Sequence, residues 1–248
     1  MDPLTNIYLE TVGRAFDAQA WLSKQKYIIN KDRTIDIDGD VNLSSLGLTQ
    51  LPFKFGKITG DFDLSYTPLN NLEGCPENIE GDFMCDFIGL KSLKGSPKRI
   101  GGSFTCIHNK LLTLEYCPEY IGMSFSCGYN YLRTLKGCPR YFNGGFYCQK
   151  NKLTTLEYGP SKVGEHYICT HNRLKTLGHC ARVIGEDLEC YNNHLTSLDD
   201  LPEHIGGLVY ADFPDEYINK AIEAAKNRKY IRTLSHDDEM PDVSDIFD

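Results

Sequence analysis

The sequence has few of the features that mark a membrane or secreted protein. It contains one tryptophan and four methionines among 248 residues, and no run of about eighteen apolar residues that could form a spanning helix. Its first residues, MDPLTNIYLETVGRAFD, lack the basic start, apolar middle and small-residue cleavage site of a secretory signal. We therefore expect a protein of the cytoplasm that has no membrane partner.

Enzyme signatures are also missing. The chain has no glycine-rich phosphate loop, no H-E-x-x-H and no G-x-S-x-G. His166 and His171 lie close together in the sequence, with Glu165 before the first, and could form an acid–base pair or bind a metal ion. Isolated surface histidines are far commoner than such sites. We therefore expect no catalysis, no cofactor and no metal.

What the sequence does contain is a repeat of 21 residues. Residues 101–121 read GGSFTCIHNKLLTLEYCPEYI, and residues 122–142 read GMSFSCGYNYLRTLKGCPRYF. The spacing continues in both directions, so about eight units span roughly residues 38–206. Leucine and isoleucine columns repeat in this register, together with an aromatic or apolar column: Val41, Phe62, Phe83, Phe104, Phe125, Phe146, Tyr167 and Leu188.

Each unit reads F-x-C-x-x-N-x-L-x-x-L, which matches the core of a leucine-rich repeat with Phe and Cys in place of two strand leucines. Phe and Cys alternate with polar residues, which predicts a short strand with one inward face. Proline opens the return path in most units and lacks a donor for sheet pairing. The predicted fold is a leucine-rich repeat solenoid with a parallel concave sheet, an irregular convex side and a helical cap at each end.

The ten cysteines follow this register too. One column contains Cys85, Cys106, Cys127, Cys148, Cys169 and Cys190, and the other contains Cys75, Cys117, Cys138 and Cys180. Cysteine is small and commonly buried, so packing is the main interpretation and free thiols are expected. The alternative is a zinc site, but zinc favours C-x₂₋₄-C pairs, and these cysteines recur at spacings of 10 or 11.

Two further columns predict structural roles. The asparagine column, Asn109 to Asn193, falls at the turn leaving the strand, where a buried amide can bond backbone groups of adjacent turns. Thr67 and Ile88 replace Asn in two early units, so this ladder should be weaker there. Glycines recur near the strand entry, and a tight corner with positive φ would explain them: Gly60, Gly81, Gly102 and Gly144.

The two ends differ from the array. Residues 1–37 carry apolar residues at helical spacing from Pro3 to about Lys24, then an alternating segment around a turn, which predicts a helix-and-hairpin cap. The solenoid is assigned to residues 38–210 and a cap helix, starting at Pro214, to residues 211–234. Residues 235–248 hold six acids and no Lys or Arg, which predicts a disordered tail. Its apolar anchors could contact a partner: Val243, Ile246 and Phe247.

The units resemble the leucine-rich repeats encoded by tailed bacteriophages. The recurrent motif of that family, L-T-S-L-x-G-C-P-x-x-[IV]-G-G-x-F-x-C-x-x-N, is seen here in residues 111–125 and 195–208. The lead-in YIINKDRTIDIDGDVNL, followed by LTQLPFKFGKITGDFDL, also resembles the start of that family. The resemblance covers nearly the whole array but not the C-terminal helix or tail. It implies the fold, a phage source and hence a host cytoplasm, and it carries no catalytic residues to transfer.

Exposed aromatic residues mark the expected binding surface. Outward strand positions form the concave face on which such solenoids bind partners. The residues assigned there are Tyr66, Phe87, His108, Tyr129, Tyr147, Lys150, His171 and Tyr191. Rows of aromatic side chains are typical of binding hot spots, although Tyr and Phe also simply suit strands. We expect a protein partner from the host or the phage, and inhibition of a host factor is one hypothesis.

Charge offers a second interpretation. Residues 83–182 hold 14 Lys or Arg and 5 Asp or Glu, although the whole chain carries a net charge of −8. Many of these basic residues fall on turns and the return path: Lys91, Lys94, Lys98, Arg99, Lys110, Arg133, Lys136, Arg140, Lys152, Arg173 and Lys175. A basic rim near aromatic rings could bind nucleic acid through phosphates and stacking. A solvated rim is the commoner outcome, and no known nucleic-acid motif accompanies it.

Overall fold

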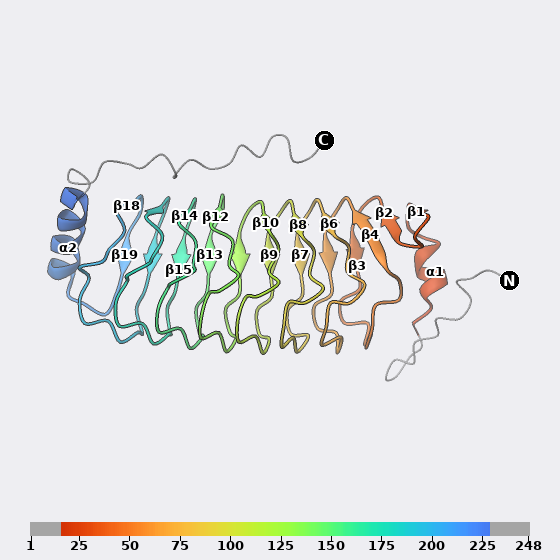
Figure 1. The fold of residues 1–248 in the computed structure, drawn as a ribbon, viewed down its shortest axis with the longest axis horizontal. Coiled ribbons are helices and arrows are strands. Elements are labelled where there is room, and N and C mark those ends of the chain that lie inside the picture. The colour runs from red at the N-terminus through yellow and green to blue at the C-terminus, as the bar shows by residue number, and fades with distance from the viewer. Residues whose placement is uncertain (1–15, 229–248) are drawn as a thin grey trace.

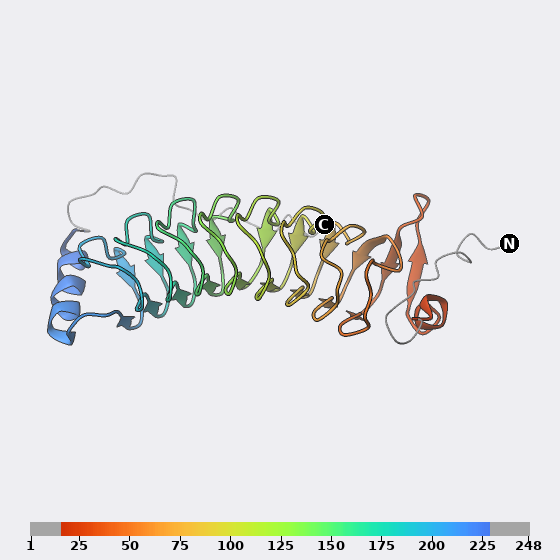
Figure 2. The ribbon, with the colours of Figure 1, turned by 90° about the horizontal axis from the view of Figure 1, so that it is seen from below.

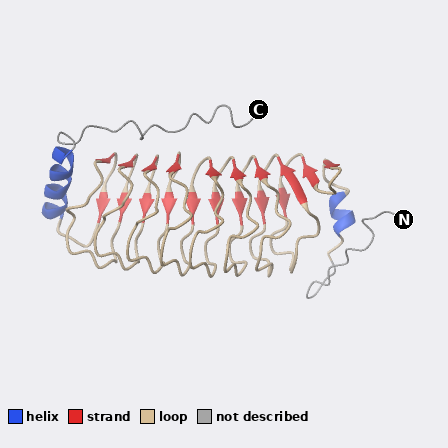
Figure 3. Ribbon diagram, viewed as in Figure 1, coloured by secondary structure: helices blue, strands red, loops and turns tan. Residues whose placement is uncertain are grey.

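The protein is an elongated parallel β-solenoid of about eight turns. The computed structural model describes residues 16–228, and in Figure 1 the turns form a nearly straight row. Two rows of short strands run along the array, one on each side of every turn (Figure 3). Seen from a perpendicular direction, successive turns still stack one behind the next along the long axis (Figure 2). The predicted repeat solenoid is confirmed.

The first row of strands is a nine-stranded parallel sheet. Its strands, in spatial order, are β3 (Val41–Asn42), β5 (Phe62–Asp63), β7 (Phe83–Met84), β9 (Phe104–Thr105), β11 (Phe125–Ser126), β13 (Phe146–Tyr147), β15 (Tyr167–Ile168), β17 (Leu188–Glu189) and β19 (Val209–Tyr210). Neighbours pair 21 residues apart without slippage, as in Phe104 opposite Phe125. The Phe and Cys of each unit therefore face the interior, as predicted.

The second row corrects the expectation of an irregular convex side. One sheet contains β1 (Tyr27–Ile29), β2 (Ile35–Ile37), β4 (Phe55–Ile58), β6 (Asn78–Ile79), β8 (Arg99–Ile100) and β10 (Tyr120–Ile121). The other contains β12 (Tyr141–Phe142), β14 (Lys162–Val163), β16 (Val183–Ile184) and β18 (His204–Ile205). Proline prevents pairing only at its own position: a few residues later, the Gly122 N–H donates to the Ile100 carbonyl at 2.9 Å.

The two return-side sheets separate between β10 and β12. There Phe142 occupies the isoleucine column, and its ring lies 5.4 Å from that of Phe146 and 5.9 Å from that of Phe125. Asn143 follows it where several other units have glycine, and its Nδ2 donates to the Gly122 carbonyl at 3.0 Å. The bulkier ring and this side-chain bond accompany the local loss of strand pairing.

The core consists of stacked columns, as the repeat predicts. Phe83, Phe104 and Phe125 stack with ring centroids 5.2 Å apart and planes within 6°. The cysteines of the strand column are fully buried beside them, and those of the second column are partly buried. All ten are free thiols. Burial of apolar area contributes roughly 25 cal/mol per Å², so these columns are the main source of stability.

The asparagine column also behaves as predicted. The Asn130 Oδ1 accepts from the Leu111 N–H at 3.0 Å, and its Nδ2 donates to the carbonyls of Cys106 at 3.0 Å and Cys127 at 3.1 Å. One amide thus ties two turns together. Thr67 bonds only within its own turn, to the Leu64 carbonyl at 2.6 Å, so the ladder is weaker in that unit.

The glycine prediction is wrong about its cause. Gly60, Gly81, Gly102 and Gly144 do not have positive φ. A Cβ on Gly102 would instead clash with the Asp82 carboxylate, which accepts the Ser103 N–H at 2.6 Å. At these four positions a side chain of the preceding unit occupies the space that a Cβ would need.

A helix lies at each end of the array (Figure 1). Helix α1 (Ala18–Leu22) is capped by Asp17, whose Oδ1 accepts the Ala20 N–H at 2.9 Å. The rest of the helix expected from Pro3 lies outside the described residues. Strands β1 and β2 form the predicted hairpin, and β2 then joins the parallel sheet through β4. Helix α2 (Asp215–Arg228) buries Ile218 and Ala225.

Candidate binding surface

The predicted aromatic column lies on a turn rather than on the outward face of a strand. In each unit the chain leaves the nine-stranded sheet through one residue in the left-handed region, with φ between 54° and 59°. These residues are Ser45, Tyr66, Phe87, His108, Tyr129, Lys150, His171 and Asn192. Each comes two or more residues after its strand has ended. These residues therefore lie in the turns that follow the strands, and not at outward strand positions as expected.

Four of these side chains form a continuous stack, the aromatic ladder: Tyr66, Phe87, His108 and Tyr129. Centroid distances are 4.8 Å from Tyr66 to Phe87, 4.2 Å from Phe87 to His108, and 4.1 Å from His108 to Tyr129. Adjacent planes differ by 12° to 24°. The rings remain exposed: 61% for Tyr66, 42% for Phe87 and 37% for Tyr129. The ladder is a strip of ring edges along one side of the rod.

The row continues with polar groups beyond Tyr129. The Lys150 Nζ lies 5.0 Å from the Tyr129 ring centroid, within the range of a cation–π contact. His171 packs edge-on against Tyr191 at 5.8 Å, and its Nε2 is 3.1 Å from the Asn192 Nδ2. The predicted site residues other than Tyr147 thus lie along one edge, with the stack at its N-terminal half.

The backbone conformation makes this choice of residues informative. Left-handed φ costs an ordinary residue roughly 1 kcal/mol, and Asn or Gly avoids much of that cost. Asn192 occupies the same column, so the turn does not require an aromatic ring. Ring stacking returns about 0.5–1.5 kcal/mol per pair, which offsets the backbone cost without burying the rings.

Basic residues flank the ladder, but many are already engaged. The Lys152 Nζ lies 4.7 Å from the Tyr131 ring centroid. On the return side, Lys98 pairs with Glu77 at 3.1 Å and Lys136 pairs with Glu115 at 3.0 Å. These bridges between turns are exposed and each contributes little to stability. These lysines of the predicted basic rim thus already have partners within the chain.

On the outer face of the nine-stranded sheet, Asp86 and Tyr147 contact other residues of the sheet. Burial raises the pKa of the Asp86 carboxyl, which accepts from the Thr105 hydroxyl and from the Ile107 N–H at 2.8 Å. Tyr147 lies half-buried across Gly145, which has no side chain to displace it. Burial, and secondarily nearby carboxylates, raise the Tyr147 pKa. Tyr147 is thus packed on the sheet, away from the ladder column.

The structure does not join the two histidines considered for catalysis. The His166 Nε2 lies 2.7 Å from the Glu186 Oε2, and its Nδ1 lies 3.5 Å from the Asp187 Oδ2. His171 contacts Tyr191 and Asn192 instead. Among residues 16–228 there is no group of three or more His, Cys, Asp or Glu placed to hold a metal ion. The two rings therefore serve separate surface contacts.

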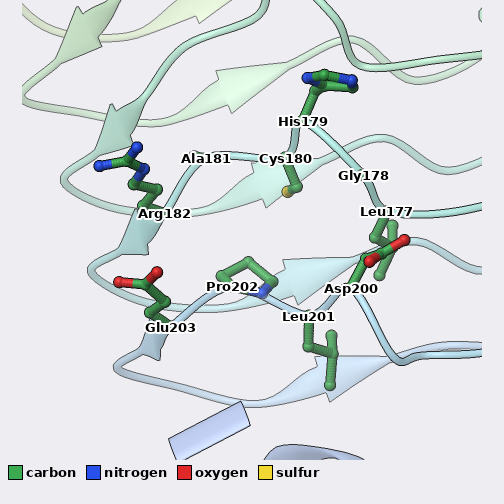
Figure 4. Close-up of a pocket in the computed structure, with 10 residues that line it drawn as sticks. All are labelled: Leu177, Gly178, His179, Cys180, Ala181, Arg182, Asp200, Leu201, Pro202 and Glu203. Carbon is green, nitrogen blue, oxygen red and sulfur yellow. The ribbon is translucent and has the colours of Figure 1, made fainter. Parts of the chain in front are cut away.

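Sequence reasoning missed one pocket of about 520 Å³ on the return path. It is lined by Leu177, Gly178, His179, Cys180, Ala181, Arg182, Asp200, Leu201, Pro202 and Glu203. The Arg182 and Glu203 side chains lie on one side of it, away from Leu177 and Asp200 (Figure 4). Ala181 stands here in place of the proline found in most units, and this exception was the one feature of the sequence that could have indicated the pocket. Burial raises the Cys180 pKa, so its thiol is not an activated nucleophile.

Two expectations concern membranes and the tail. Within the part of the chain that the structure describes, no helix has the length and apolar character needed to span a bilayer. The proposed tail contacts, Val243, Ile246 and Phe247, lie outside the described residues.

No protein-family model, curated protein or solved structure matches this chain.

Proposed function

We propose that the protein is a non-enzymatic interaction module that binds another protein along the aromatic ladder. The observation that carries this proposal is the exposed stack from Tyr66 to Tyr129, held in left-handed turns where Asn would fit with less strain. Exposed aromatic rows are rare on surfaces that contact only water and common at binding hot spots. The rings are preorganised, so little side-chain entropy would be lost on binding.

The ring orientation favours a protein over nucleic acid as the partner. Bases bind aromatic residues face to face, but each inner ladder ring already has both faces covered by its neighbours. Ring edges remain available, and they suit aliphatic and aromatic side chains of a partner protein. Nucleic acid bound through Lys110, Lys152 and Arg173 is the alternative, and it requires phosphate contacts alone.

The resemblance to leucine-rich repeats of tailed phages supports a narrower proposal. The fold is then a leucine-rich repeat array in which α1 and α2 act as caps, and the partner is a host or phage protein in the host cytoplasm. Inhibition of a host factor, for example one used in replication or transcription, is the form of activity this origin favours. The acidic tail would supply a second contact.

The test replaces the ladder without disturbing the turns. Phe87→Asn plus Tyr129→Asn removes two rings from the left-handed turn column, in which a later unit of the chain already has Asn192. The matched control is Tyr116→Asn plus Tyr158→Asn, because these tyrosines are also exposed and left-handed but lie in another column. Each protein is used to capture partners from a bacterial lysate, and the affinity for any stoichiometric partner is then measured.

We expect the ladder variant to bind at least a hundredfold more weakly, which corresponds to about 2.7 kcal/mol, and the control to bind as the wild type does. Equal binding by the ladder variant and the wild type contradicts the proposed surface. Binding of generic single-stranded or duplex nucleic acid that weakens steeply with salt would support the alternative instead. Turnover of a small substrate would contradict both.

A further inference from the structure

Strand β1 is the end strand of the six-stranded sheet, and nothing in residues 16–228 pairs with its outer edge. Its three residues are consecutive, apolar and exposed: Tyr27 by 41%, Ile28 by 67% and Ile29 by 49%. Natural edge strands usually carry a lysine, a proline or a bulge that prevents further pairing. Residues 27–29 carry none of these.

The hydrogen bonds show which backbone groups face outward. The Asp38 N–H donates to the Lys26 carbonyl at 2.8 Å, and the Asn30 N–H donates to the Thr34 carbonyl at 2.9 Å. In an antiparallel ladder the bonded residues alternate, so Ile28 also bonds β2. Tyr27 and Ile29 therefore direct their N–H and C=O groups away from β2. Ile35, which lies opposite Ile29, shows the same pattern: its N–H points away from β1 and donates to the Lys54 carbonyl at 2.9 Å.

We propose that two copies of the chain associate by antiparallel pairing of β1 with β1, around a two-fold axis at Ile28. In this register Tyr27 lies opposite Ile29 of the partner subunit, and both residues present outward N–H and C=O groups. Four main-chain hydrogen bonds then form, and every one uses a group that β2 leaves free. The contact is self-complementary, as a two-fold interface must be.

Side chains and charge fit the same register. Tyr27 and Ile29 lie opposite the buried Ile37 and Ile35, so they extend the core face of the sheet, and pairing would cover them. Antiparallel pairing also places the segment before β1 of one subunit beside the hairpin turn of the other, so Lys24 and Asp32 of the partner subunit lie at the same end of the contact and attract each other, once at each end. The patch is much smaller than a standard interface of about 1,600 Å², so we expect a dissociation constant on the order of 10 μM. This proposal is independent of the aromatic ladder.

The experiment measures the mass of the full chain by sedimentation between about 1 and 200 μM, a range centred on the expected constant. Ile29→Pro removes an outward N–H that β2 does not use, so the hairpin is retained while pairing is blocked. Ile29→Val is the matched control, because it keeps both the N–H and an apolar side chain. We expect concentration-dependent dimers for the wild type and Ile29→Val, and at least tenfold weaker association for Ile29→Pro.

A second variant does not depend on the proline being tolerated. Lys24→Glu should weaken association by placing like charges together, and adding Asp32→Asn should recover it, since Asn retains the acceptor for the Thr34 N–H at 3.1 Å. A wild-type chain that stays monomeric throughout the range overturns the proposal. So does a dimer that Lys24→Glu leaves unchanged but that is lost in Phe87→Asn plus Tyr129→Asn, because the interface is then the ladder.

Discussion

The asparagine ladder leads to a quantitative prediction at Asn130. The Asn130→Ala variant leaves the buried Leu111 N–H without its acceptor, which is the Asn130 Oδ1 at 3.0 Å. The carbonyls of Cys106 and Cys127 each lose one of two amide donors, because Asn109 bonds the first at 3.0 Å and Asn151 bonds the second at 3.1 Å. The Gly128 carbonyl, which accepts from the Asn130 Nδ2 at 3.1 Å, keeps the His108 N–H at 3.3 Å. The variant therefore leaves one buried donor without an acceptor and weakens three acceptors.

The expected cost follows from these contacts. A buried donor left unsatisfied costs about 1–3 kcal/mol, and each lost bond to a still-satisfied carbonyl costs about 0.5–1 kcal/mol. We expect Asn130→Ala to lower the free energy of unfolding by about 3 kcal/mol. Asn193→Ala is the control: it makes the same types of bond, but Asn193 is only partly buried, so water can replace them and the loss should be about 1 kcal/mol.

Urea unfolding followed by circular dichroism gives both free energies. Amide hydrogen exchange adds a local readout, since the Leu111 amide should exchange faster in Asn130→Ala while amides in distant turns change less. The reasoning is refuted if Asn130→Ala costs no more than Asn193→Ala, or if the Leu111 amide keeps its protection. Either result would mean that the bonds between turns are not the contacts that hold adjacent units together.

Three further predictions follow from buried groups. The Tyr167 hydroxyl is buried with no hydrogen-bond partner in residues 16–228 and points towards Gly159. Tyr167→Phe should therefore raise the free energy of unfolding by about 1 kcal/mol. A loss of stability in urea unfolding would contradict this. A Cβ on Gly122 would clash with the Gly101 carbonyl, so Gly122→Ala should lower the melting temperature by at least about 4 °C, whereas an unchanged value would show that the turns can separate there. Burial raises the pKa of the strand-column thiols, to about 12 for Cys190. The folded chain thus keeps protons that the unfolded chain releases near pH 8.5, so stability should be complete below that pH and fall by several kcal/mol as the pH rises to about 10, and a urea midpoint independent of pH would argue against buried thiols.

The repeat determined much of the fold without any coordinates. Because the period is 21 with no slip, each column must have one environment, and the Phe, Cys and Leu columns can be assigned to the interior from chemistry alone. The same reasoning predicts the asparagine ladder and its weak unit at Thr67. Exceptions to a column also carried information. Gly159 stands where four other units have Cys, and it leaves room for the Tyr167 hydroxyl.

The binding surface was only half predictable. Composition picks out Tyr66, Phe87, His108 and Tyr129 as an aromatic column, but alternation along a strand places them on a sheet face. Only the tertiary structure shows the left-handed turn that moves them to an edge and stacks them. Likewise, the sequence predicts an apolar strand over residues 27–29, whereas its position at the end of the sheet, among the described residues, depends on which strands pair with β2. The 21-residue period alone decides which residues share a column. The direction in which a turn leaves the sheet, and the strand that pairs with an edge, depend on packing between units, and the sequence of a single unit does not specify that packing.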